Sequence, residues 1–196
     1  MPPRLSTRLF ATALALLATS TAMAIEEPAF RLVERDGAFE LREYAPHVVA
    51  DTRVEANFTD AGNAAFQRLF RYISGNNVAQ QKIAMTAPVT QVEAGDGHRV
   101  AFALPASYTL ETAPTPLDKA IEIRAVPARL VASWRYAGRW TESNYREHEA
   151  KLREQIEKRG LTITGEPILA RYNPPFMPSF LRRNEVLIPV ERSTSH

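Results

Sequence analysis

The residues best suited to ligand chemistry gather on one expected helix in the first half of the chain. Within residues 59–77 the apolar side chains recur at helical spacing, and arginines lie at the margins of the apolar face. An apolar surface with one or two cations at its rim is what a planar apolar molecule carrying carboxylates requires. A solvated helix face would carry the same arginines, and that alternative stays open. The residues are Phe66, Leu69, Phe70 and Ile73 on the face, with Arg68 and Arg71 at its margins.

The rest of the sequence offers few residues suited to metal binding or to nucleophilic catalysis. The chain has no cysteine, which excludes disulfides, thiolate metal sites and cysteine nucleophiles. The histidines show neither H-x-x-H nor H-x-x-x-H spacing, so a zinc site is not indicated. Glu43 and His47 could be combined with a serine into a hydrolytic site, but no nucleophile-elbow motif accompanies them.

An unusual stretch, KIAMTAPVTQ at residues 82–91, has the pattern of a strand at both ends and Met-Thr-Ala-Pro between them. Proline cannot donate to a β-ladder, so we expect this strand to be bulged at Pro88 or to lie at a sheet edge. The distal segment YNPPFMP, residues 172–178, is stiffened by its prolines. We expect the two segments to pack on each other. They either hold the sheet together or line a ligand site, and both interpretations stay open.

The elements that position these residues follow the same order in both halves of the chain. Each half, 39–104 and 120–190, is expected to contain strand, helix, strand and strand, with breaks near Pro46 and Pro127. The helices are expected over 59–77, capped by Thr59 or Asp60, and over 141–160, capped by Thr141. We predict one α+β domain over 39–192. Its sheet is a distorted, barrel-like, mainly antiparallel sheet with two long helices, built by pseudo-twofold duplication of a β-α-β-β unit. Residues 25–38 are expected as a lead-in and 193–196 as a tail.

The first 24 residues are expected to be a secretory leader and not part of the fold. Arg4 and Arg8 precede a short apolar run, and Ala22-Met23-Ala24 provides an A-x-A cleavage site. The apolar run is too short for a membrane span of about 20 residues. The leader holds two of the 24 basic residues and none of the 22 acidic ones, so the remaining chain is charge-balanced. We therefore expect a periplasmic or secreted protein with no membrane span after cleavage and no nucleic-acid partner.

The motifs also carry a family resemblance. KIAMTAPV, followed by RYNPPFMPSFLRRNEVLIPV, resembles the SOUL haem-binding protein family, as do ELREYAPHVVA and FQRLFRYISGNN. The resemblance runs from about Phe39 to Val190. It implies a distorted barrel-like sheet with two helices, related to effector-binding domains of some bacterial transcription regulators.

For function, the resemblance implies a monomeric carrier or buffer that binds haem or another tetrapyrrole non-covalently, and no enzyme. Arg71, before Tyr72, matches a basic residue of haem-binding relatives, whereas Asn63 stands where another relative has arginine. Some relatives have histidine at the position of Glu43, which makes the nearby His47 a candidate axial iron ligand. The alternatives are a module for another amphiphilic small ligand, or an enzyme acting on tetrapyrroles or lipids. The expected ligand-binding residues are Phe66, Arg68, Leu69, Phe70, Arg71, Tyr72 and Ile73.

Overall fold

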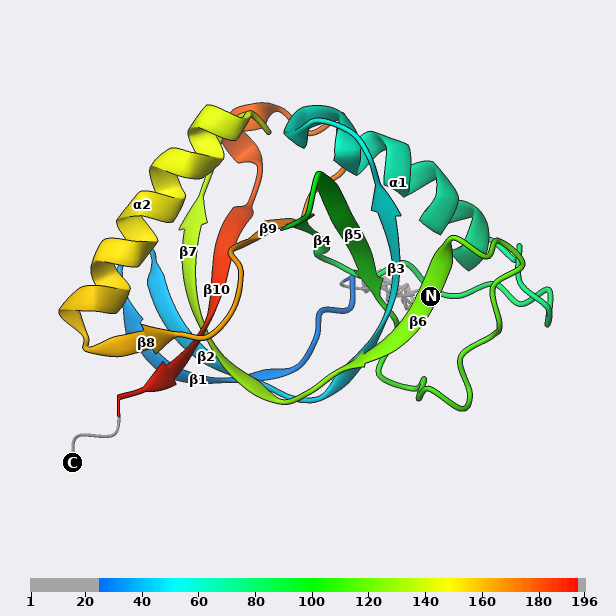
Figure 1. Ribbon diagram of the computed structural model, residues 1–196, viewed down its shortest axis with the longest axis horizontal. Helices are drawn as coiled ribbons and strands as arrows, with labels where there is room; N and C mark the ends of the chain where they lie inside the picture. Colours follow the sequence, from blue (N-terminus) through cyan, green and yellow to red (C-terminus); the bar gives the residue numbers. More distant parts are fainter. Residues whose placement is uncertain (1–24, 194–196) are drawn as a thin grey trace, which may run out of the picture.

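The computed structural model describes residues 25–193, so the predicted leader at 1–24 and most of the expected tail lie outside the described residues. The described chain forms one curled sheet and two long helices (Figure 1). The strands are β1 (Phe30–Asp36), β2 (Phe39–Tyr44), β3 (His47–Val54), β4 (Val89–Ala94), β5 (Gly97–Ala103), β6 (Ile121–Val126), β7 (Arg129–Tyr136), β8 (Leu161–Ile163), β9 (Ile168–Arg171) and β10 (Asn184–Arg192). The helices are α1 (Phe58–Ile73) and α2 (Glu142–Lys158), with a 3-10 turn at Ser179–Leu181.

The strand order shows the predicted duplication. The strands follow the order β1-β2-β7-β10-β9-β4-β5-β3-β6, all neighbours pair antiparallel, and β8 pairs with β10. Exchanging β2 with β6, β7 with β3, β10 with β5 and β9 with β4 reproduces the same order from the other end. The first strand of each half therefore pairs with a strand of the other half, β2 with β7 and β6 with β3. Strands β9 and β4 join the two halves at the centre of the sheet (Figure 1). The α+β fold class and its pseudo-twofold are confirmed, with a sheet that curls like a barrel but stays open.

Both helices begin at side-chain caps. Thr141 accepts a hydrogen bond from the Asn144 backbone N–H, as its position predicted. For α1 the prediction of Thr59 or Asp60 as the cap was wrong by two or three residues, because the Asn57 side chain accepts from the Asp60 N–H and α1 already begins at Phe58. Within residues 25–193 no helix is both long and apolar enough to cross a membrane.

Three of the prolines that the sequence singled out lie outside the strands, whereas Pro189 lies within β10. Pro46 lies between β2 and β3, and Pro127 lies between β6 and β7, as expected. The prediction of a bulge or an edge at Pro88 was wrong: β4 starts at Val89, directly after the proline, and lies in the middle of the sheet between β5 and β9. A proline placed before the first ladder residue needs no N–H for the ladder.

The expected lead-in also contains structure, since β1 lies within residues 25–38 and pairs with β2 at one edge of the sheet. Its side chains are mostly exposed, so it lacks the apolar alternation that identifies a buried strand from sequence.

The helices cover one face of the sheet and leave the other face free. Helix α1 packs on β3 and β5, and α2 packs on β7, β8 and β10. Each helix has its own apolar cluster, one containing Leu69 and Val100 and the other Leu152 and Val186. Because strand side chains alternate, the residues between these core positions point to the opposite, concave face.

Candidate functional site

A groove of about 460 Å³ lies between α1 and the two prolyl segments that the sequence singled out. Its size falls within the range of roughly 300–1,000 Å³ that is usual for small-molecule sites. The lining residues come from α1 (Gly62, Asn63, Phe66, Gln67), from the segment before β4 and its first residue (Met85, Thr86, Ala87, Val89), from the end of β9 onward (Arg171, Tyr172, Asn173, Pro174, Pro175), and from Ile25 and Trp140.

The two prolyl segments form adjoining walls because of the register between β4 and β9. Val89 is paired with Arg171 in antiparallel strands, so the residues before one and after the other leave the sheet at the same end. Thr86 Oγ1 donates to the Ala103 carbonyl oxygen at 2.6 Å, and the Ala87 N–H donates to the Glu26 carbonyl oxygen at 2.9 Å. The segment before β4 is thus fixed by hydrogen bonds and also lines the groove.

Arg171 gives the groove its charge. Its side chain is buried, with 8% of the residue exposed, and Nη2 donates to Gln91 Oε1 at 2.6 Å. No acidic side chain of the described chain pairs with it, and its buried Nε has no hydrogen-bond partner there. Burial lowers the pKa of Arg171 to about 10. A buried cation without a counter-charge is costly for the fold, so an anion that entered the groove would gain an unused partner.

Two neighbours position the guanidinium. Gln91 is itself buried and fixed, since its Nε2 donates to the Phe58 carbonyl oxygen at 2.9 Å. Gly62 supplies the space on α1, because a Cβ at this position would overlap Arg171 Nη1. The Trp140 ring lies beside the cation, with its centroid 5.3 Å from the guanidinium carbon. Apolar and aromatic walls around a buried cation suit a flat apolar ligand that carries a carboxylate.

Comparison with known proteins decides the family. The family model described as SOUL heme-binding protein matches residues 25–189. This chain belongs to the SOUL haem-binding protein family. The SOUL protein described here is 32% identical to Heme-binding protein 1 of Xenopus tropicalis over 162 residues, 78% of this chain and 84% of the relative. It is 38% identical to human Heme-binding protein 2 over 84 residues, 40% of this chain and 41% of the relative.

Solved structures with low sequence identity share the fold. The EcmrR C-terminal domain superposes with a TM-score of 0.59 at 14% identity, covering 84% of this chain and 99% of that domain. A hydrolase from Listeria innocua gives a TM-score of 0.60 at 12% identity, covering 78% of this chain and 91% of the hydrolase. At such identities these similarities concern the fold alone.

The groove beside α1 contains only one of the predicted site residues. Phe66 lines it, and Phe70, 45% exposed, stacks on Phe66 with ring centroids 5.7 Å apart. Leu69 and Tyr72 are 0% exposed and Ile73 is 5% exposed, all three inside the α1 core cluster. These three side chains pack in the core and do not line the groove. Apolar side chains at helical spacing mark the face toward the core, and the groove lies on the neighbouring flank of α1.

The predicted arginines lie outside the groove. Arg68 Nη1 donates to Thr52 Oγ1 at 2.7 Å, and its Nε pairs with Asp118 at 3.3 Å, so this side chain is directed toward β3 and the connector. Arg71 is exposed in the last turn of α1. Asn63, where the resemblance placed a relative's arginine, does line the groove.

His47 lies in a different cavity. It begins β3 and lines a space on the concave face, so the structure does not bring it to the α1 flank as the axial-ligand prediction required. Its Nδ1 is 3.0 Å from the Ala45 carbonyl oxygen. No group of three or more potential metal ligands occurs within residues 25–193.

The residues that sequence reasoning missed are Arg171 and Trp140. Arg171 immediately precedes the YNPP motif and could have been found as the motif's first residue. Nothing in the sequence around Trp140 distinguishes it. The residues present fit haem: an apolar groove, a buried cation with an unpartnered Nε, and in Met85 a sulfur donor on the wall.

Proposed function

We propose that this SOUL protein binds haem or a related tetrapyrrole non-covalently in the groove beside α1. The observation that carries the proposal is Arg171, a buried cation without a carboxylate partner in the described chain, in a groove with aromatic walls. A propionate of the ligand would supply the missing counter-charge. The apolar rings would contact Phe66 and Trp140, and this burial would contribute most of the affinity.

Met85 is the side chain best placed to hold iron. It carries the one sulfur among the lining residues that the structure describes, and none of these is a histidine. The Tyr172 hydroxyl, the other candidate, donates to Glu185 Oε2 at 2.8 Å and is engaged there. Bound haem would supply redox and ligand-exchange chemistry at its iron, and a thioether ligand favours the reduced metal.

The rest of the proposal concerns where the protein works. The expected leader favours an exported protein, and we infer that it works in the periplasm as a monomeric carrier or buffer and not as an enzyme. Removal of the leader after Ala24 would create a terminal ammonium on Ile25, which lines the groove. That ammonium would be a second cation at the rim, available to the second propionate.

Titration of the mature protein with hemin, followed at the Soret band, tests the function. We expect a saturable spectral shift at micromolar hemin. Its absence would remove haem binding as the function. If hemin and unrelated apolar ligands raised the melting temperature equally, the protein would be a module for another amphiphilic ligand.

Variants separate the site from the function. Arg171→Gln should weaken hemin binding at least tenfold, because the propionate loses its buried partner. Arg135→Gln, an exposed arginine on β7, is the matched control and should change the affinity less than twofold. Arg71→Gln tests the site expected from the sequence. If hemin affinity fell in Arg71→Gln but not in Arg171→Gln, the ligand would bind at the end of α1 and not in the groove.

A further inference from the structure

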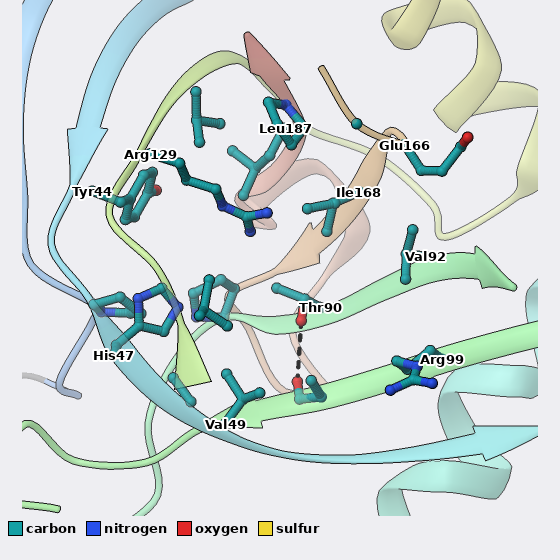
Figure 2. Close-up of a pocket in the computed structure, with 18 of the residues that line it drawn as sticks. Tyr44, His47, Val49, Thr90, Val92, Arg99, Arg129, Glu166, Ile168 and Leu187 are labelled. Carbon is teal, nitrogen blue, oxygen red and sulfur yellow. Dashed lines mark hydrogen bonds between the residues drawn. The ribbon is translucent and has the colours of Figure 1, made fainter. Parts of the chain in front are cut away.

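A second cavity, of about 210 Å³, lies on the concave face of the sheet, away from the helices. Eight strands contribute to its lining, and small residues such as Ala101, Ala103 and Gly165 leave the space open. Its apolar walls are formed by Val49, Val126, Val131, Ile168 and Leu187. Figure 2 labels Val49, Ile168 and Leu187 among them. The space is smaller than the roughly 300 Å³ at which drug-sized sites begin, so its ligand must be small.

This concave cavity is separate from the groove beside α1. Strand β4 divides the two: Val89 lines the groove, whereas Thr90 and Val92 line the concave cavity. No residue lines both spaces. A ligand in one therefore needs no contact with a ligand in the other.

Arg129 is the distinctive group of the concave cavity. Figure 2 shows its guanidinium directed into the space toward Ile168. The side chain is half-buried, and no hydrogen bond or ion pair joins it to an acidic residue in the part of the chain that the structure describes. Burial and the neighbouring Arg124 lower the pKa of Arg129.

The surrounding charges do not neutralise Arg129. Asp51 is shared by Arg124 and Arg99, whose Nη1 lies 3.3 Å from Asp51 Oδ1. The Glu166 carboxylate lies at the rim and is directed away from the Arg129 guanidinium (Figure 2). Arg99 also pairs with Glu122 at 3.4 Å.

The pKa of His47 also depends on the arginines of the concave cavity. Burial lowers its pKa, the hydrogen bond with Ala45 opposes this, and the charges of Arg129 and Arg124 add to the lowering. The uncharged imidazole adds no positive charge of its own. Among the charged lining residues Arg129 is the one without an acidic partner in the described chain, and this leaves a place for an anion.

We propose that the concave cavity is a second binding site, specific for a small organic anion with a short apolar body. Its carboxylate pairs with Arg129, which has no acidic partner in the described chain, and with the terminal N–H groups of Arg124, whose Nε already donates to Asp51. Its apolar part contacts Val49, Val131 and Leu187. The site is independent of haem binding, because it uses other residues on the other face of the sheet.

Calorimetric titration with benzoate and hexanoate tests the site, with benzyl alcohol and inorganic phosphate as comparison probes. We expect saturable binding of at least one carboxylate, at least tenfold tighter than benzyl alcohol and phosphate. Equal binding of benzyl alcohol would show a merely apolar hole. Equal binding of phosphate would show a simple anion site. Either result, or no carboxylate binding at all, overturns the proposal.

Arg129→Gln should abolish carboxylate binding while leaving the hemin titration unchanged. Arg135→Gln, further along the same strand and exposed, serves as the matched control and should bind both ligands like the unaltered protein. Because Arg129 has no described partner to lose, the variant should fold, and its melting temperature verifies this. Carboxylate binding retained in Arg129→Gln would contradict the assignment, whatever the hemin result.

Discussion

At the scale of single residues, two buried arginines have opposite environments. Arg42 forms a two-point ion pair with Glu185, with Nη1–Oε2 and Nη2–Oε1 distances of 2.6 and 3.0 Å. Tyr172 also donates to this carboxylate, so the family motif YNPP…RRNEV builds a closed polar network. Arg171 has only the neutral Gln91. The first arrangement stabilises the fold, while the second leaves a charge for a ligand.

Arg171→Met should therefore stabilise the protein in the absence of haem while weakening hemin binding. A similarly sized apolar side chain removes an uncompensated buried charge, and we expect the free energy of unfolding to rise by about 1 kcal/mol. Urea unfolding with and without hemin measures both effects. A loss of stability in the ligand-free variant would mean that the bond to Gln91 outweighs the burial of charge.

Glu185 should make the protein sensitive to acid. Burial raises the pKa of Glu185, but the hydrogen bond and charge of Arg42, with Arg183 and Tyr172, outweigh it and hold the pKa below the usual 4.5. Its contribution to stability is present above pH 4.5 and is lost as the pH falls through the lowered value. Glu185→Gln should cost about 3–5 kcal/mol at pH 7 and flatten the acid limb of the stability curve.

The control for Glu185 is Glu154→Gln, in an exposed pair with Lys158 on α2. It should change stability by less than about 1 kcal/mol. Unfolding curves at several pH values compare the two, and equal effects would show that burial of the Glu185 pair is irrelevant.

At the scale of elements, α1 carries the groove on a flank that depends on one glycine. Glycine within a helix normally costs about 1 kcal/mol relative to alanine, so its replacement would usually stabilise the helix. At Gly62 the new Cβ would overlap Arg171 Nη1, and this contact decides the outcome.

Gly62→Ala should consequently lower both the stability and the hemin affinity, although helix propensity alone would predict a gain in stability. The double variant Gly62→Ala with Arg171→Met should recover stability, because the clash is gone and the propensity gain remains. Thermal unfolding of the unaltered protein, the two single variants and the double variant gives the coupling free energy between the two positions. Additive effects would mean that the two residues do not interact as the structure has them.

The helices also show what periodicity can and cannot locate. The spacing of Leu69 and Ile73 predicted a helix and its apolar face, and both are present. The same spacing was interpreted as a ligand surface, whereas in the structure Leu69 and Ile73 pack in the core, because the apolar stripe of a helix is first of all the stripe that packs on the sheet.

At the scale of the whole molecule, the groove includes the residue that follows the expected cleavage site. Ile25 would be the first residue of the exported protein, and it lines the groove. The groove would then be completed only when the leader is removed.

Protein beginning at Ile25 should therefore bind hemin more tightly than protein with Gly-Ser added before Ile25, about threefold to tenfold for one exposed charge. The Soret titration measures the difference, and N-terminal sequencing of the exported protein checks the start. The matched control is protein that begins at Ile25 and carries the added Gly-Ser after the C-terminus. Equal affinities would remove the terminal ammonium from the site.

The sequence by itself determined the family, the fold class, the duplication and the approximate elements, because these depend on local spacing, caps, turns and contiguous motifs. Only the tertiary structure decided which side chains share a space. Arg171 and Gly62 are far apart in the chain and meet because β9 pairs with β4, which places Arg171 against the flank of α1 at Gly62. Whether a charge is paired depends on such long-range register, and no local pattern records it. That is why Arg71 and His47 were predicted at the haem site, whereas Arg171 lies in the groove and Arg129 in the concave cavity.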